Sequence, residues 1–259
     1  MALKRLLYAD DCKTSLALVD RFLSKFGYIV VAVSDGMQAV EQAKTSPFHA
    51  ILMDMRMPVM DGVAATLAIR ALPAPRCDTP IIGLTAGTDY EMRSCINCGM
   101  DLVLPKPINF EQLVEALSAI TVGAAFAAVE PPPAAPATLR GSAPINLVTL
   151  QQVVDDLGRA AVRAAFVTFR QECADLLGGV ALAAARRRAS EADLALANLA
   201  ASARVFGGER LSMVATDCRA KAVGQAAFLD TDFKLLTLAA AELVDLLDMA
   251  LAAGSARAA

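Results

Sequence analysis

Five short apolar segments alternate with segments of helical periodicity in the first half of the chain, and this alternation constrains the fold more than any other feature. The apolar segments are rich in Val, Ile and Leu, and they occupy 5–10, 28–34, 50–55, 80–86 and 102–107. Longer segments between them, such as 15–26 and 62–72, carry apolar residues at helical spacing. Strands that alternate with helices predict a doubly wound α/β unit, in which helices cover both faces of a five-stranded parallel sheet.

An Ala- and Pro-rich segment, 122–144, follows this unit and predicts a linker. It contains three consecutive prolines, which cannot continue a helix and favour an extended path. The residues after it show no strand signals. Their apolar residues recur at helical spacing, and glycines such as Gly158 and the Gly178–Gly179 pair predict the breaks between helices. We therefore expect one domain over 1–121 and an all-α antiparallel helical bundle over 145–254.

Charge and hydropathy exclude several classes of partner. The formal net charge is only -3, and neither half has the basic excess of a domain that binds nucleic acid. No run approaches the roughly 18 apolar residues of a membrane span. The first residues reach acidic side chains too early for a signal peptide. We expect a cytoplasmic protein that binds neither nucleic acid nor membrane, with six cysteines that need not pair.

Residues capable of phosphoryl chemistry stand at the ends of the predicted strands. They are Asp10 and Asp11 after the first strand, Asp54 after the third, Thr85 after the fourth and Lys106 after the fifth. The ends of parallel strands meet at one sheet edge, so these side chains should converge. Three crowded carboxylates favour a hard cation such as Mg²⁺. A carboxylate held there can attack phosphorus, while the metal and the lysine neutralise charge and the threonine hydroxyl binds a phosphoryl oxygen.

The motifs at these strand ends resemble those of the receiver domain of bacterial two-component signalling. They are DD, ILMDMRMPVMDG, LTA and LPKPI, and they span the whole first unit. The resemblance implies a flavodoxin-like fold in which Asp54 is the phosphoacceptor. It also implies that Asp11, Asp54 and the backbone carbonyl of Arg56 hold Mg²⁺, and that Asp10 positions the ion through water. Thr85 and Lys106 would contact the phosphoryl group.

Two further expectations come from the same resemblance. The peptide bond between Lys106 and Pro107 should be cis, a form that only X–Pro bonds adopt cheaply. Receivers usually carry Tyr or Phe three residues before the lysine, and this ring moves inward on activation. The present chain has Val103 there, which predicts a weak conformational response of the last strand.

The second unit resembles a histidine-containing phosphotransfer (HPt) domain, a four-helix bundle whose hallmark is A-H-x-L-K-G-S-A-x-x-F-G. In the segment ANLAASARVFG, Leu199, Ser202, Ala203, Phe206 and Gly207 match this pattern. The phospho-accepting histidine falls on Ala197, the lysine on Ala200 and the glycine on Ala201. Core-facing positions keep helical spacing, whereas the three alanines and Arg204 should lie on the neighbouring face. Two interpretations of that face stay open: a retained docking surface, and decay after loss of use.

Other motifs have simpler interpretations. His49, the only histidine, precedes the third strand and is expected to be a strand-edge residue. Cys95 and Cys98 have the spacing of redox and zinc motifs, but no second pair matches it, which favours free thiols. The run Arg186–Arg188 is expected to be a solvated helix end rather than an anion site.

These observations predict a response regulator rather than an enzyme acting on other substrates. A histidine kinase or an HPt protein would phosphorylate Asp54, and the HPt-like bundle would be a protein-binding or dimerisation output. One alternative is a phosphate sink that drains a kinase. Another is a non-enzymatic scaffold or inhibitor that mimics a phosphotransfer domain.

Overall fold

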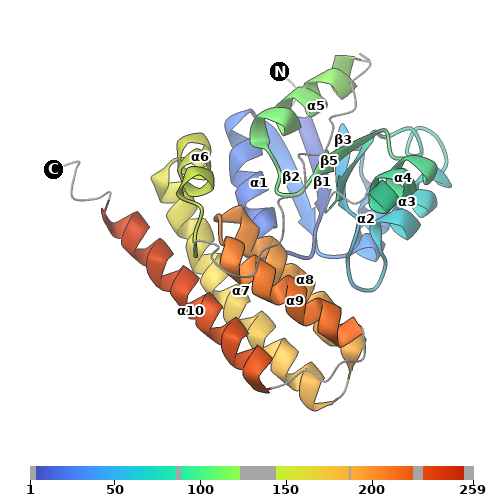
Figure 1. The fold of residues 1–259 in the computed structure, drawn as a ribbon. Helices are drawn as coiled ribbons and strands as arrows, with labels where there is room; N and C mark the ends of the chain where they lie inside the picture. The colour runs from blue at the N-terminus through green and yellow to red at the C-terminus, as the bar shows by residue number, and fades with distance from the viewer. Residues whose placement is uncertain (1–3, 86–88, 123–143, 187, 224–229, 254–259) are drawn as a thin grey trace. The chain divides into compact units, whose positions relative to one another are not determined.

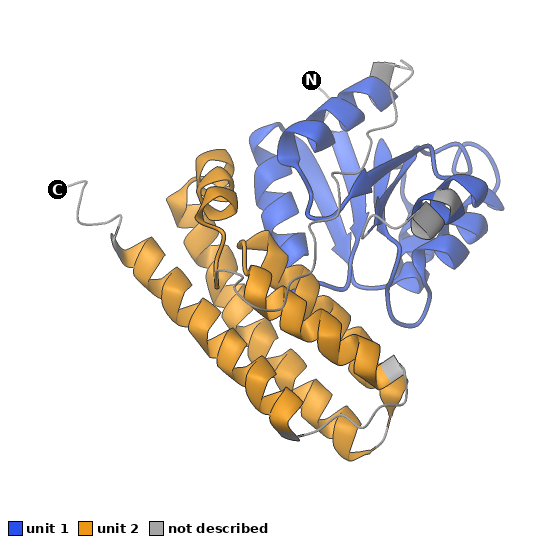
Figure 2. Ribbon diagram, viewed as in Figure 1, with its two compact units in different colours: residues 1–134 blue, residues 135–259 orange. Residues whose placement is uncertain are grey.

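The computed structural model describes residues 4–85, 89–122, 144–186, 188–223 and 230–253. The chain divides into two compact units, residues 1–134 and 135–259 (Figure 2). The division falls inside the predicted linker 122–144, nearly all of which lies outside the described residues.

The first unit contains a five-stranded parallel sheet. Its strands are β1 (Lys4–Ala9), β2 (Tyr28–Val33), β3 (Ala50–Asp54), β4 (Ile81–Thr85) and β5 (Leu102–Pro105), each within two residues of its predicted start. The spatial order is β2-β1-β3-β4-β5, which is the flavodoxin-like order of doubly wound sheets. All five residues of β3 are buried, because β3 has strands on both sides and helices above and below.

Helices cover both faces of this sheet (Figure 1). On one face lie α1 (Lys13–Lys25) and α5 (Phe110–Val122), joined by stacked rings of Phe22 and Phe110 whose centroids are 4.4 Å apart. On the other lie α2 (Gly36–Thr45), α3 (Gly62–Arg70) and α4 (Asp89–Asn97). The core beneath these three helices contains alternate residues of the central strands, such as Ile51 and Met53, as the two-residue period of a strand requires. The predicted doubly wound α/β unit is confirmed.

All the regular secondary structure in the described part of the second unit is helical. Its helices are α6 (Leu147–Leu157), α7 (Arg159–Ala185), α8 (Ala189–Val205), α9 (Glu209–Val223) and α10 (Asp230–Ala253). Helix α8 packs against α7 and α9, and α10 also packs against α7 and α9, so these four helices close a ring. The shorter α6 packs against α7 and α8, and Asn146 caps its first turn by accepting from the N–H groups of Val148 and Thr149.

The core of the helical unit explains one error in the predicted boundaries. A break was expected at Gly178–Gly179, but α7 runs through both glycines. The buried residues Cys173, Val180 and Ala183 lie on either side of them at helical spacing. Packing of this face outweighs the cost of about 1 kcal/mol that each glycine adds to a helix interior.

No helix in the described ranges combines the length and the apolar character that a membrane crossing requires.

Candidate functional site

The structure brings the predicted strand-end residues together at the carboxyl edge of the sheet. The Lys106 ammonium lies 2.8 Å from Oδ2 of Asp10 and 2.9 Å from Oδ2 of Asp54. Carboxylate oxygens of Asp10, Asp11 and Asp54 all lie within 4.8 Å of one another. This convergence follows from the topology, because β1 and β3 are paired neighbours and β4 and β5 continue the same edge.

Asp10 is held from three directions. Its Oδ1 accepts a hydrogen bond from the backbone N–H of Cys12 at 2.9 Å, and its Oδ2 accepts from the Tyr8 hydroxyl at 2.6 Å and from Lys106. Asp10 and Tyr8 are both fully buried. The strand-end pattern did not indicate a role for Tyr8. Its position two residues before Asp10, hence on the same face of the strand, is the signal that could have revealed it.

Burial and charge shift the titration of this cluster. Burial raises the pKa of Asp54 to about 6, and the nearby Asp10 adds to the rise, although the Lys106 ammonium and the Arg56 backbone N–H oppose it. Burial alone lowers the pKa of Lys106, but the charges of Asp10 and Asp54 outweigh this and raise it above its ordinary value. Lys106 is therefore a permanent cation, whereas Asp54 gains or loses its proton at mildly acidic pH.

Thr85 and Lys106 occupy neighbouring strand ends. Thr85 is buried and pairs in register with Pro105, and its carbonyl oxygen accepts from the Lys106 N–H at 2.7 Å. The Lys106–Pro107 peptide bond is cis, as predicted. Val103, which occupies the usual aromatic position, is partly buried against the core.

The loop after Asp54 passes very close to the backbone of that residue. A Cβ atom on Gly62 would lie 2.2 Å from the Asp54 carbonyl oxygen, so only glycine fits. The Gly62 N–H donates to the Met55 carbonyl oxygen at 3.0 Å, and the preceding Asp61 caps α3 through the Ala64 N–H. The glycine of the MDG motif thus fixes the backbone that carries Asp54.

The fold and this site define a class of protein: a doubly wound α/β domain that presents a buried carboxylate beside a lysine and two further carboxylates. The family model for the response regulator receiver domain matches residues 6–118. This part of the chain is therefore a receiver domain.

Known proteins of several kinds resemble this chain. It is 44% identical over 114 residues to the sensor protein GacS of Pseudomonas syringae, covering 43% of this chain and 13% of GacS. It is 40% identical over 105 residues to the histidine kinase BarA of Shigella flexneri, covering 40% of this chain and 11% of BarA. A crystal structure of the receiver domain of sensor histidine kinase PA1611 from Pseudomonas aeruginosa, with a magnesium ion in its active-site cleft, is 35% identical. That match covers 47% of this chain and 99% of the solved one, with a TM-score of 0.45.

The positions of the three alanines on α8 require one correction. Leu196, Leu199, Ala203 and Phe206 are fully buried, as the helical spacing predicted. Ala197 and Ala201 are partly exposed and Arg204 is exposed. Ala200, however, is only 4% exposed and belongs to the core. The α8 face therefore consists of Ala197, Ala201 and Arg204, because Ala200 lies nearer the packed side of the helix than the pattern predicted.

The remaining motifs have structural roles. All six cysteines are free, and Cys95 and Cys98 are buried, with the Cys98 thiol donating to the Cys95 carbonyl oxygen at 3.1 Å. His49 lies immediately before β3, where its Nδ1 accepts from the Arg5 N–H at 3.0 Å. Arg188 pairs with Glu191 at 2.7 Å between well-exposed side chains. The free thiols, the strand-edge histidine and the solvated helix end are confirmed for the described residues.

Proposed function

We propose that this protein is a response regulator whose Asp54 accepts a phosphoryl group from the phosphohistidine of a histidine kinase or an HPt protein. The observation that carries the proposal is the single Lys106 cation shared by Asp10 and Asp54. In the reaction, an Asp54 oxygen forms a bond to phosphorus as the N–P bond of the donor breaks, and the donor imidazole takes up a proton. Lys106 neutralises charge on the transferred group, and the Thr85 hydroxyl donates to one of its oxygens.

The residues at this edge fit a magnesium ion. Carboxylates are the hard oxygen ligands that Mg²⁺ prefers, and the three carboxylates lie within 4.8 Å of one another. Asp11 and Asp54, with the Arg56 carbonyl, would hold the ion, and Asp10 would orient it through water. When bound, Mg²⁺ supplies further charge neutralisation at the phosphoryl group. The domain would catalyse only its own phosphorylation and dephosphorylation.

Phosphorylation by a small donor tests this site. The intact chain, incubated with acetyl phosphate and MgCl₂, should gain the mass of one phosphoryl group. Asp54→Asn should abolish the gain, because an amide cannot form an acyl phosphate. Asp248→Asn, which removes an exposed carboxylate on α10, is the matched control and should label normally. Persistent labelling of Asp54→Asn would refute the assignment, and an unlabelled wild-type chain would favour a non-enzymatic scaffold.

We further propose that the helical unit is a four-helix HPt-like bundle, with α6 as an additional helix, that binds protein instead of carrying phosphate. The closed ring of α7 to α10 supports the bundle. The chain has no histidine after His49, so the helical unit has no imidazole that could form a phosphoramidate. The methyl groups of Ala197 and Ala201 lose little on desolvation, which suits a contact with a kinase's helical bundle or with a second copy of this chain.

Charge introduced on α8 tests the second proposal. Ala197→Glu and Ala201→Glu should weaken self-association in sedimentation experiments, or binding to the purified kinase, while the circular dichroism spectrum stays helical. Ala241→Glu places the same charge on an exposed position of α10 and should change neither. Unchanged associations in both α8 variants would mean that the face is decayed and that the output lies elsewhere.

A further inference from the structure

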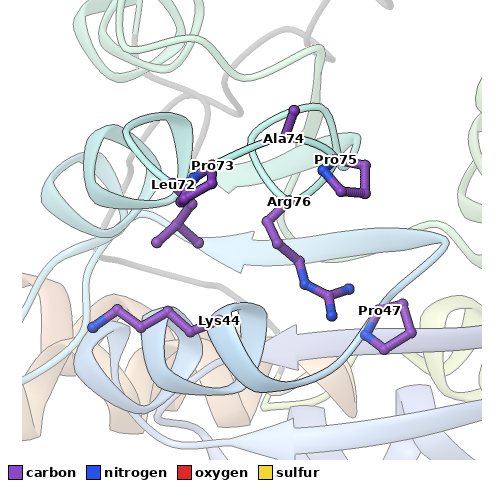
Figure 3. Close-up of a pocket in the computed structure, with 7 residues that line it drawn as sticks. All are labelled: Lys44, Pro47, Leu72, Pro73, Ala74, Pro75 and Arg76. Carbon is purple, nitrogen blue, oxygen red and sulfur yellow. The ribbon is translucent and has the colours of Figure 1, made fainter.

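A pocket of about 550 Å³ lies at the edge of the sheet opposite the carboxylate cluster. Its walls come from the end of α2 with Pro47 in the loop between α2 and β3, and from the loop between α3 and β4 (Figure 3). The lining residues are Lys44, Pro47, Leu72, Pro73, Ala74, Pro75 and Arg76. They precede β3 and β4, whereas Asp54 and Thr85 end those strands. An occupant of this pocket would leave access to the phosphoacceptor open.

The loop that forms one wall is held in place by Arg70, the last residue of α3. Its Nη1 donates to the carbonyl oxygens of Cys77 and Thr79 at 2.6 and 2.7 Å, and its Nε donates to the Gly99 carbonyl oxygen at 2.8 Å. Its Nη2 lies 2.7 Å from the Asp101 carboxylate, which also accepts from the Ile81 N–H. A wall fixed by this many bonds loses little conformational entropy when a ligand binds.

The lining combines apolar walls with positive charge. Three prolines, Leu72 and an alanine supply the apolar surface, and none of the lining residues is acidic. The Arg76 guanidinium extends across the pocket toward Pro47 (Figure 3). Within the described ranges Arg76 makes no ion pair, and its side chain is partly buried. Lys44 has only a long contact of 3.5 Å with Glu41, both side chains being about half exposed or more, and such pairs exchange easily.

We propose that this pocket binds a small organic carboxylate with an apolar body. The pocket is an open hollow, since five of its seven lining residues are exposed, and its volume of about 550 Å³ gives room for a small organic molecule. A guanidinium binds a carboxylate through two parallel hydrogen bonds, and Lys44 adds a second positive charge. A specific protein–protein interface buries about 800 Å² of surface on each partner and has an apolar centre, whereas the neighbouring exposed residues Glu41, Thr45 and Asp78 are polar. The proposal is independent of Asp54 phosphorylation.

Binding of a carboxylate probe and of its neutral amide tests the proposal. In a titration of the ¹⁵N-labelled full chain at pH 7, 4-phenylbutyrate should shift the backbone amides of Leu72, Ala74 and Arg76 in a saturable way. The uncharged 4-phenylbutyramide should bind at least about tenfold more weakly, because it cannot form the charged bidentate pair. Equal affinities of the two probes, or no saturable shift with 4-phenylbutyrate, would overturn the proposal.

Variants of the two cations locate the binding group. Arg76→Gln should weaken 4-phenylbutyrate binding about tenfold, Arg76→Lys should have a smaller effect, and Lys44→Gln should weaken it a few fold. Arg21→Gln, which removes an exposed cation on α1, should leave it unchanged. Amide shifts elsewhere in the domain that match the wild type would show that each variant is folded. Undiminished binding by Arg76→Gln, or saturation only by an acidic peptide, would contradict the assignment.

Discussion

The ammonium group of Lys106 lies 2.8 Å from the carboxylate of Asp10, a side chain with no exposure to solvent. Removing the cation leaves Asp10 facing Asp54 inside the fold with no positive partner. We expect Lys106→Met to lower the free energy of unfolding of the metal-free protein by about 3 kcal/mol. Removing one partner of a buried ion pair leaves the other charge buried and uncompensated. Urea unfolding measures this loss. Millimolar MgCl₂ should restore part of it, and a variant as stable as the wild type without metal would contradict the shared-cation arrangement.

The raised pKa of Asp54 predicts a pH-dependent stability. The pKa is about 6 in the folded chain and about 3.9 in an unfolded one. The folded state therefore binds the proton more tightly, and ionisation of Asp54 destabilises the fold as pH rises through 6. At pH 8 without metal, Asp54→Asn should raise the free energy of unfolding by on the order of 1 kcal/mol, because it removes a buried negative charge. The gain stays this small because the variant also loses the bond to Lys106. The advantage should shrink between pH 7 and pH 5. If the stability of Asp54→Asn relative to wild type instead increases as the pH falls, the pKa of Asp54 is not raised.

Gly62 should be intolerant of any side chain. A Cβ atom there would lie 2.2 Å from the Asp54 carbonyl oxygen, so Gly62→Ala must displace the backbone that carries the Asp54 side chain. We expect a loss of about 2 kcal/mol in stability and slower labelling by acetyl phosphate. The two readouts should change together, and normal labelling in a stable Gly62→Ala variant would show that the loop can adjust freely.

Replacement of Gly178 by alanine should have the opposite effect on stability. It lies inside α7, and a Cβ atom on it would meet nothing within 4 Å beyond its chain neighbours and the backbone of its own helix. Gly178→Ala should therefore stabilise the helical unit by about 0.5–1 kcal/mol, by removing conformational freedom from the unfolded chain. Thermal unfolding followed at 222 nm measures it. A lower midpoint would indicate that α7 needs the glycine for a bend or a close contact.

Local sequence pattern was enough to predict the strands and the cluster at their ends, because period, burial and parallel topology agree there. Asp10, Asp54, Thr85 and Lys106 each follow or end a strand, and a shared edge brings them together. The same reasoning failed at Gly178–Gly179, where long-range packing of α7 overrides a local preference, and at Ala200, which the packed neighbours of α8 bury. The pocket beside Arg76 depends on contacts between elements distant in sequence, which no local pattern encodes, whereas Tyr8 stands two residues before Asp10 and was open to prediction from the strand period.

The four acceptors around Arg70 limit which amino acids can replace this residue in sequences that keep the fold. Its guanidinium serves the Cys77, Thr79 and Gly99 carbonyl oxygens and the Asp101 carboxylate at once. Lysine carries the same charge but offers one nitrogen with three donors on a single point, so it cannot span these acceptors. Arginine and lysine can replace each other at most surface positions, but lysine cannot replace Arg70. A library of variants at this site should therefore retain arginine and reject lysine along with the neutral residues.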